Sequence, residues 1–334
     1  MEKIKNLIKL MRPNQWFKSF FIVLGSAPAI FLMPVRFDLI LLFLFAGISN
    51  MILLQGVMYI TNDIADAKED GMHPKKKNRP ISCGKISIRE ATAFGLLLFC
   101  LALMLAFVID LKIVLIDLLL FLNNMFYSFK PIRLRDKPYI DVGSVALNSP
   151  LRSMVGWYLF EPYNQARLSF SYKFISTKNV TDSIQSIFFN AHPRIINFSI
   201  NFSTVTLSFI SIMLVTYFLA IFLLITKRLA EKLTLKNADK IRKTLKYYAL
   251  VELKVIAMFS TLMVFISLLL LSWALKPALV IISPFILLIM YWYYKLAFSK
   301  NSVVAVPEEM FVKVPKFTFA MISLCIFALI ILLL

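Results

Sequence analysis

Three aspartates stand at helical spacing directly after a long apolar segment. Asp63, Asp66 and Asp70 occupy positions i, i+3 and i+7, which places them on one face of a helix. Acidic side chains at the mouth of a membrane span are costly unless a cation neutralises them, so they indicate a functional site. Oxygen ligands of this kind suit magnesium, and the sequence therefore predicts a metal site at the three aspartates.

Basic residues flank this acidic stretch. Lys75, Lys76 and Arg79 follow it closely, and Asn62 directly precedes its first aspartate. Lysine and arginine bind phosphate oxygens well, and arginine does so through a planar fork of donors. Carboxylates, a divalent cation and basic side chains together predict a site for a diphosphate.

A second set of candidate residues follows the fourth apolar segment. It consists of Tyr127, Lys130, Arg133, Lys137 and Asp141. Two prolines break any continuing helix here, so the segment is predicted to be a loop that ends in a helix start. Asp141 would then be a fourth carboxylate facing the first three. The alternative is an ordinary basic loop whose aspartate stabilises a helix N-terminus.

Further charged residues lie at the ends of other apolar segments. Lys227, Arg228 and Glu231 end the sixth segment, and Lys18 begins the first. Substrate binding is one interpretation, while snorkelling of lysine and arginine at a membrane boundary is the other. Arg152 is different because it lies within an apolar segment, where a bound anion or Asp141 would have to pair with it.

Composition identifies the class of protein. The 334 residues are 60% hydrophobic with a mean hydropathy of +0.78, and several apolar runs are long enough to cross a bilayer as helices. The net charge of +19 is explained by basic cytoplasmic loops, so no nucleic-acid partner is expected. The three cysteines are far apart and indicate neither a disulfide framework nor a metal pattern.

We expect an all-α polytopic membrane protein with about nine transmembrane helices in one bundle. The predicted spans are roughly 16–34, 38–61, 90–109, 112–128, 139–160, 204–226, 250–272, 277–296 and 317–334. One domain is predicted to cover 1–334, with an external insertion at about 161–203. Most lysines and arginines lie on the side of the N-terminus, which predicts a cell-membrane protein whose N-terminus and candidate site face the cytoplasm.

The spans and motifs resemble the UbiA superfamily of intramembrane prenyltransferases. Asn62, Asp63, Asp66 and Asp70 match its first motif, and Tyr127, Lys130 and Asp141 match its second. The likeness is closer to the decaprenyl-phosphate phosphoribosyltransferase branch. The segments that carry it are Arg12–Lys18, His73–Ile81, Asp141 with Leu151–Gly156, Lys227–Glu231 and Pro307–Glu309.

This resemblance implies a magnesium-dependent transferase with a cavity open to the cytoplasm and to membrane lipids. Its aspartates would bind Mg²⁺, which holds a diphosphate donor, and Asp66, Asp70, Tyr127 and Asp141 would form the catalytic set. The closer branch implies phosphoribosyl pyrophosphate as donor and polyprenyl phosphate as acceptor. Transfer of a polyprenyl group from its diphosphate to an aromatic or glycerophosphate acceptor is the alternative.

A membrane transporter with an acidic metal-binding mouth is an alternative of another class. Transporters tend to show internal repeats and charged groups at the bilayer midplane. This sequence shows no such repeat, and its charged residues gather towards one side of the membrane. The pattern therefore favours the enzyme over the transporter.

Overall fold

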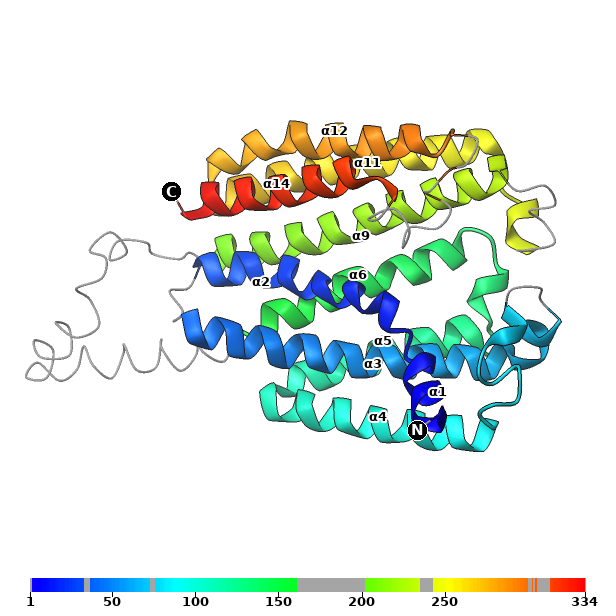
Figure 1. The fold of residues 1–334 in the computed structure, drawn as a ribbon. Helices are drawn as coiled ribbons and strands as arrows, with labels where there is room; N and C mark the ends of the chain where they lie inside the picture. Colours follow the sequence, from blue (N-terminus) through cyan, green and yellow to red (C-terminus); the bar gives the residue numbers. More distant parts are fainter. Residues whose placement is uncertain are drawn as a thin grey trace, which may run out of the picture.

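The computed structural model describes most of the chain as a bundle of helices (Figure 1). The described residues are 2–32, 37–72, 76–160, 202–234, 243–299, 302, 304 and 313–333, and they contain no strand. The predicted insertion therefore lies almost wholly outside the described residues. The same holds for Lys75 and for the segment around Pro307.

Ten α-helices and five short 3-10 helices follow one another in this part of the chain. The α-helices are α1 (Glu2–Leu10), α2 (Phe21–Leu32), α3 (Phe37–Gly71), α4 (Ile88–Ile109), α5 (Leu111–Ser128), α6 (Ile140–Tyr158), α9 (Phe202–Thr234), α11 (Leu250–Leu275), α12 (Ser283–Leu296) and α14 (Pro315–Leu333). The 3-10 helices are η1 (Pro13–Phe20), η2 (Lys76–Asn78), η3 (Leu134–Asp136), η5 (Lys243–Lys246) and η6 (Pro277–Ile282).

Each predicted span coincides with a helix, which confirms the predicted class of fold. By length and composition, six helical segments could cross a membrane. Five lie in α3, α4, α5, α9 and α11, and the sixth is formed by η6 together with α12. The first, fifth and ninth predicted spans correspond to α2, α6 and α14, which are not among these six segments. The chain is thus a multi-pass membrane protein.

Two helices continue past the predicted ends of their membrane spans through polar residues. The span predicted to end at residue 61 continues as α3 to Gly71, and the span predicted to end at residue 226 continues as α9 to Thr234. Charged side chains on these last turns find ion-pair partners on neighbouring segments. No proline interrupts either extension, so both candidate motifs are helical.

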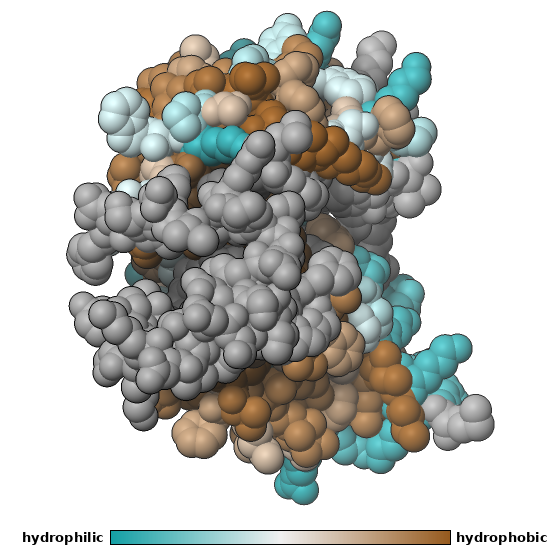
Figure 2. All heavy atoms as spheres, turned by 90° about the vertical axis from the view of Figure 1, so that its left-hand side faces the viewer, coloured by the Kyte–Doolittle hydropathy of each residue, from teal (hydrophilic) through white to brown (hydrophobic). Residues whose placement is uncertain are grey.

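The hydrophobic core of the described residues has three parts. One lies among α2, α3, α4, α5 and α6, and a second lies among α6, α9, α11, α12 and α14. The third packs the end of α1 against α3 and α4. Large hydrophobic side chains also remain exposed on the outside, among them Phe45, Val108 and Trp273. Figure 2, which views the end opposite the candidate site, shows broad hydrophobic areas on the described surface. Such a surface suits contact with lipid.

Glycines bring α2 and α6 into direct backbone contact. A Cβ at Gly156 would lie 2.0 Å from the carbonyl oxygen of Ile22, and a Cβ at Gly25 would lie 1.8 Å from that of Ser153. The hydroxyl of Ser26 donates a hydrogen bond to the carbonyl of Gly156 at 3.1 Å. Small residues allow such close approach of membrane helices. This contact fixes α6, the helix of Arg152, against the start of the chain.

Candidate active site

Four segments that are distant in sequence meet at one end of the bundle. The end of α3, the loop between α5 and α6, the end of α9 and the start of α11 all lie on the right in Figure 1. The sequence predicted that these segments share one side of the membrane. Their common position brings the acidic and basic candidate residues into one region.

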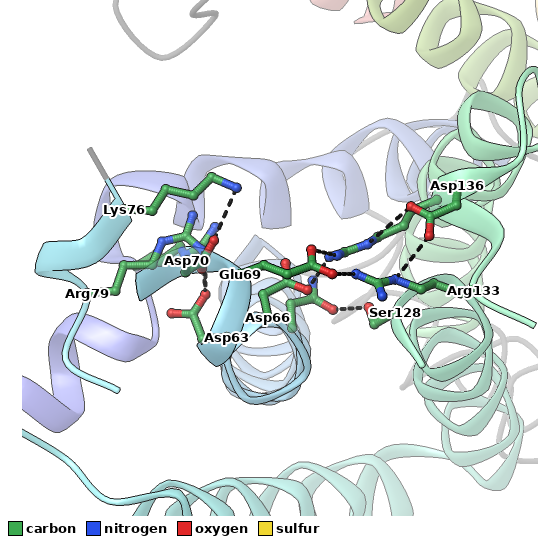
Figure 3. A network of polar contacts seen from close by, with 12 residues as sticks. Asp63, Asp66, Glu69, Asp70, Lys76, Arg79, Ser128, Arg133 and Asp136 are labelled. Atoms are coloured by element: carbon green, nitrogen blue, oxygen red, sulfur yellow. Dashed lines mark hydrogen bonds and ion pairs between the residues drawn. The ribbon is translucent and has the colours of Figure 1, made fainter. Parts of the chain in front are cut away.

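The three predicted aspartates of α3 separate into a pair, Asp63 and Asp70, and a single residue, Asp66. Residues seven apart on an α-helix differ by only about 20° in direction, whereas residues three apart differ by about 60°. Asp63 and Asp70 therefore share one line along the helix, and Asp66 is turned towards the α5–α6 loop. Figure 3 shows the two groups on different sides of the helix end.

Asp63 and Asp70 converge on a single guanidinium group. Nη1 of Arg79 lies 3.1 Å from Oδ1 of Asp63 and also contacts Oδ2 of Asp70. Arg12 pairs with Asp63, and Nζ of Lys76 lies 3.3 Å from Oδ1 of Asp70. Both carboxylates are only 2% exposed. Two nearly buried carboxylates thus share one position for a positive charge.

Asp66 and Glu69 form the second pair, and arginines from the α5–α6 loop neutralise them. Arg135 contacts Asp66 and donates to Oε2 of Glu69 at 2.9 Å, while Arg133 donates to Oε1 of Glu69 at 2.7 Å. Asp136 lies 3.3 Å from Nε of Arg133. Partial burial acts to lower the pKa of Arg133, but the hydrogen bond to Glu69 and the nearby carboxylates outweigh it and raise that pKa.

The structure places Asp141 in a separate buried cluster. Its carboxylate accepts a hydrogen bond from Tyr248 and lies 3.4 Å from Nη2 of Arg228, which also pairs with Glu231 at 3.1 Å. Burial and then the hydrogen bond to Asp141 raise the pKa of Tyr248, so the phenol keeps its proton and remains a donor. Of the residues predicted to bind substrate, Arg228 therefore pairs with Asp141, and Glu231 pairs with Arg228.

Across the described helices and loops, no three carboxylate, histidine or cysteine side chains converge as metal ligands. The carboxylates of each pair, Asp63 with Asp70 and Asp66 with Glu69, instead share an arginine, whose guanidinium group occupies the position of a cation. Of the four predicted metal ligands, the structure brings Asp63 and Asp70 together and directs Asp66 and Asp141 to other partners. A role for Asp66 and Asp141 in metal binding stays a prediction.

Three cations gather around Tyr59, one turn before the acidic motif on α3. The guanidinium of Arg12 lies 4.7 Å from the centre of the Tyr59 ring, and Nζ of Lys18 lies 3.4 Å from its hydroxyl. Arg152 on α6 interacts electrostatically with the same tyrosine. We call Arg12, Lys18 and Arg152 the Tyr59 cation group. Arg12 also connects it to Asp63.

Arg152 has no matching negative charge among the described residues. Its side chain is nearly buried, with 9% of the residue exposed, and it makes no ion pair or hydrogen bond there. Asp141, one partner considered for it, is occupied by Arg228 and Tyr248. A buried cation in a membrane protein needs an anion, so the arrangement favours the bound-anion alternative.

The positions of the remaining predicted residues do not indicate a role in substrate binding or catalysis. Asn62 accepts a hydrogen bond from Ser128, which joins α3 to α5 beside the motif. Lys130 and Lys137 are exposed on the α5–α6 loop, and Tyr127 is half-buried on α5. Lys227 is half-buried on α9. Their predicted roles in substrate binding or catalysis stay predictions.

Sequence reasoning missed several residues of this region. Gln55 and Tyr59 precede Asp63 at intervals of four, so they share its face of α3. Gln55 donates to the Tyr59 hydroxyl at 3.0 Å. The sequence could have indicated Gln55 and Tyr59 as site residues through this spacing. Arg135 was missed although its neighbours Arg133 and Lys137 were selected, and its choice of Asp66 depends on how the loop folds.

A helical membrane protein with paired carboxylates and cations at one end is the class that the fold and site define. The model of the UbiA prenyltransferase family matches residues 19–303, which is most of the chain. The chain therefore belongs to the UbiA prenyltransferase family. Residues 19–303 include the carboxylates of α3, the α5–α6 loop and Arg152.

Named relatives and solved structures agree with this membership. A 4-hydroxybenzoate octaprenyltransferase of Marinomonas sp. is 32% identical over 125 residues, which are 35% of this chain and 41% of that protein. A decaprenyl-phosphate phosphoribosyltransferase of Corynebacterium glutamicum is 27% identical over 156 residues, 45% of each chain. The matched stretch spans less than half the length of either relative.

A solved UbiA homolog from Archaeoglobus fulgidus, bound to DMAPP and Mg²⁺, has the same fold. Its TM-score is 0.63 at 17% sequence identity, and the match covers 98% of this chain and 99% of that one. At this identity the likeness concerns the fold. It confirms the predicted helical bundle, whereas the opening of a central cavity to the cytoplasm and to lipid stays a prediction.

Proposed function

We propose that this protein is an intramembrane transferase that binds a diphosphate donor at the end of α3 and a polyprenyl lipid within the bundle. Family membership and the two carboxylate pairs with their arginines support this proposal. One membrane domain contains the whole reaction, and its membrane is the cell membrane. The end with the site faces the cytoplasm, which the excess of basic residues there supports.

The residues at the end of α3 fit Mg²⁺. This ion is usually held by one or two carboxylates together with phosphate oxygens of the substrate, and Asp63 and Asp70 offer two such carboxylates at one position. The nitrogen of Arg79 that now joins them shows that a cation fits between them. The solved UbiA homolog bound to Mg²⁺ supports the same choice of ion. When bound, Mg²⁺ supplies charge stabilisation for a leaving diphosphate.

Arginines and a lysine supply the remaining positive charge for the donor. Arg79, Arg135 and Lys76 are partly exposed, so each can exchange a carboxylate partner for a phosphate oxygen. A diphosphate held in this way loses part of its charge before the bond breaks. The developing negative charge on the leaving group then meets donors already in place.

Phosphoribosyl transfer to a polyprenyl phosphate is the reaction that the geometry supports best. The observation that carries it is Arg152, a nearly buried cation that makes no ion pair with a described residue and interacts electrostatically with Tyr59. A second anion, separate from the diphosphate, could bind at Arg152. Arg12 contacts both Tyr59 and Asp63, so the two anions would lie on either side of it.

The bonds in this reaction balance without a protein base. A phosphate oxygen of the lipid attacks the anomeric carbon of phosphoribosyl pyrophosphate and forms the new C–O bond. The old C–O bond breaks, and pyrophosphate leaves with the electron pair. The Tyr59 cation group orients the lipid phosphate, while the arginines near α3 hold the departing pyrophosphate.

Prenyl transfer is the second candidate. The octaprenyltransferase relative, named for transfer of a prenyl group, and the homolog bound to DMAPP, a prenyl diphosphate, favour it. In this reaction the same carboxylates and arginines hold the diphosphate of a polyprenyl lipid. The acceptor is then an aromatic ring or a glycerophosphate, and an anionic acceptor group contacts Arg152.

A matched pair of assays separates the two reactions. The full-length protein in lipid nanodiscs with Mg²⁺ receives either phosphoribosyl pyrophosphate with polyprenyl phosphate, or polyprenyl diphosphate with aromatic and glycerophosphate acceptors. We expect pyrophosphate release and a phosphoribosylated lipid in the first assay alone. Product in the second assay alone establishes prenyl transfer, and ion flux in liposomes without product in either assay contradicts a transferase.

A further inference from the structure

A buried carboxyl group outside the candidate site lies between α3 and α5. Asp117 of α5 is fully buried, and so is its partner Asn50 of α3. Nδ2 of Asn50 donates a hydrogen bond to Oδ2 of Asp117 at 2.9 Å. Neighbouring residues on both helices, including Met51, Leu54 and Ile116, belong to the hydrophobic core.

Each member of this pair has one oxygen without a hydrogen-bond donor. Oδ1 of Asn50 and Oδ1 of Asp117 are both buried and find no partner among the described residues. An ionised carboxylate accepts hydrogen bonds and cannot donate one, so it leaves both oxygens unsatisfied. An unpaired charge and two unmatched acceptors are costly within a membrane.

One proton resolves all of these deficits. A protonated carboxyl group donates from Oδ1, and the amide oxygen of Asn50 is an acceptor in need of a donor. The two side chains then form a ring closed by two hydrogen bonds, one from the amide nitrogen to the acid and one from the acid to the amide oxygen. The pair then carries no net charge.

The pair is the first of three polar links along one seam. Further along both helices, Asn124 donates to the hydroxyl of Thr61 at 2.8 Å, and Ser128 donates to Asn62. The order of the links shows that α3 and α5 run parallel, and the last link lies beside Asp63. The seam therefore fixes how α3 is placed along α5 as it enters the candidate site.

We propose that Asp117 is a protonated carboxylic acid that forms an acid–amide ring with Asn50, and that this ring sets the position of α3 along α5. Asp117 lies on a different helix from Asp63, and its hydrogen-bond partner is Asn50. The proposal concerns the resting protein and does not depend on which reaction it catalyses.

The variants Asp117→Asn, Asp117→Leu and the exchange Asn50→Asp/Asp117→Asn test the ring in the full-length protein in nanodiscs. An amide at 117 can form the same two hydrogen bonds, whereas leucine forms neither. Thr216→Val is the matched control, because Thr216 is equally buried and its hydroxyl bonds only to carbonyls of its own helix.

Infrared difference spectra of wild type against Asp117→Asn report the protonation state directly. We expect the carbonyl stretch of a protonated acid in the wild type, its loss in Asp117→Asn and its return in the exchange variant. Thermal midpoints should stay near wild type for Asp117→Asn, the exchange and Thr216→Val, and should fall by several degrees for Asp117→Leu. The midpoint of Asp117→Leu tests only the ring's contribution to stability.

Two results overturn the proposal. A carboxylate band in place of the acid band shows that Asp117 is ionised. A midpoint for Asp117→Asn well below that of Thr216→Val shows that the ring does not form. Should Asp117→Leu fail to fold, the spectra and midpoints of the other variants decide, and none of these measurements uses enzyme turnover.

Discussion

Two clusters of carboxylates and arginines lie at the same end of this molecule and differ in their access to solvent. Around Asp63 and Asp70, the side chain of Arg79 is 25% exposed, whereas Arg228 beside Asp141 is only 3% exposed. The first cluster has more than one cation for each carboxylate, and those cations lie on loops and short helices. The second is closed by Tyr248 from the α11 side.

The difference predicts that the same side-chain chemistry serves two purposes. In an ion pair with an accessible cation, the carboxylate can exchange that cation for a metal, and the cation can exchange its carboxylate for a phosphate, at little cost. A sealed pair cannot do so, because removing either partner leaves an uncompensated buried charge. We therefore expect changes at α3 to act on catalysis and changes at Asp141 to act on folding, and four predictions test this comparison.

Removal of divalent cations should have the largest effect. With a chelator in excess, we expect turnover in nanodiscs to be lost and to return when Mg²⁺ is added. Because a ligand that binds the folded state stabilises it, Mg²⁺ should also raise the thermal midpoint of wild type and fail to raise that of Asp63→Asn/Asp70→Asn. Full turnover in the chelator contradicts the metal assignment.

The single change Asp63→Asn should lower kcat by roughly 1000-fold, as expected for loss of one preorganised electrostatic contact. Its fold should survive, because Arg79 keeps Asp70 as a partner. The matched control is Asp136→Asn at the exposed edge of the same network, which should leave turnover near wild type. An equal loss of kcat in both variants would contradict a special role for the carboxylates of α3.

Arg152→Gln should separate substrate binding from stability. We expect the KM for polyprenyl phosphate to rise roughly 10- to 100-fold, as for loss of hydrogen bonds to a charged group. The thermal midpoint should stay level or rise, because an unpaired buried charge has been removed. A fall in the midpoint without a change in KM would identify Arg152 as a structural residue.

Asp141→Asn should have the smallest effect on turnover and a clear effect on folding. Loss of a buried partner of Arg228 should lower the free energy of unfolding by about 3 kcal/mol, which thermal unfolding in detergent will show. Below the unfolding transition, turnover should remain close to wild type. Intact stability with lost turnover would instead place Asp141 with the metal ligands, as its position after the fourth span suggested.

Much of the fold could be predicted from the sequence because a bilayer demands long apolar helices. Each predicted span contains a helix, and α4 begins within two residues of its predicted start. The ends of α3 and α9 could not be predicted in the same way. Their last turns are polar, and contacts such as those of Asp70 with Arg79 and Arg228 with Asp141 accompany the continued helices.

The candidate site could be predicted only in its composition. The spacing of Asp63, Asp66 and Asp70 indicated one helical face, yet the structure directs Asp66 to Arg135 and the other two to Arg79. Which arginine meets which carboxylate depends on the path of the loops. Asp117 gave no motif at all, and only its contact with Asn50 shows its importance.

By itself, the sequence determined the membrane class, the helices and the side of the bundle on which acids and bases meet, since hydropathy and charge act locally along the chain. The tertiary structure alone decided which ion pairs keep a partly exposed arginine and which are sealed. That outcome depends on desolvation, and a side chain loses its water only when segments distant in sequence pack around it.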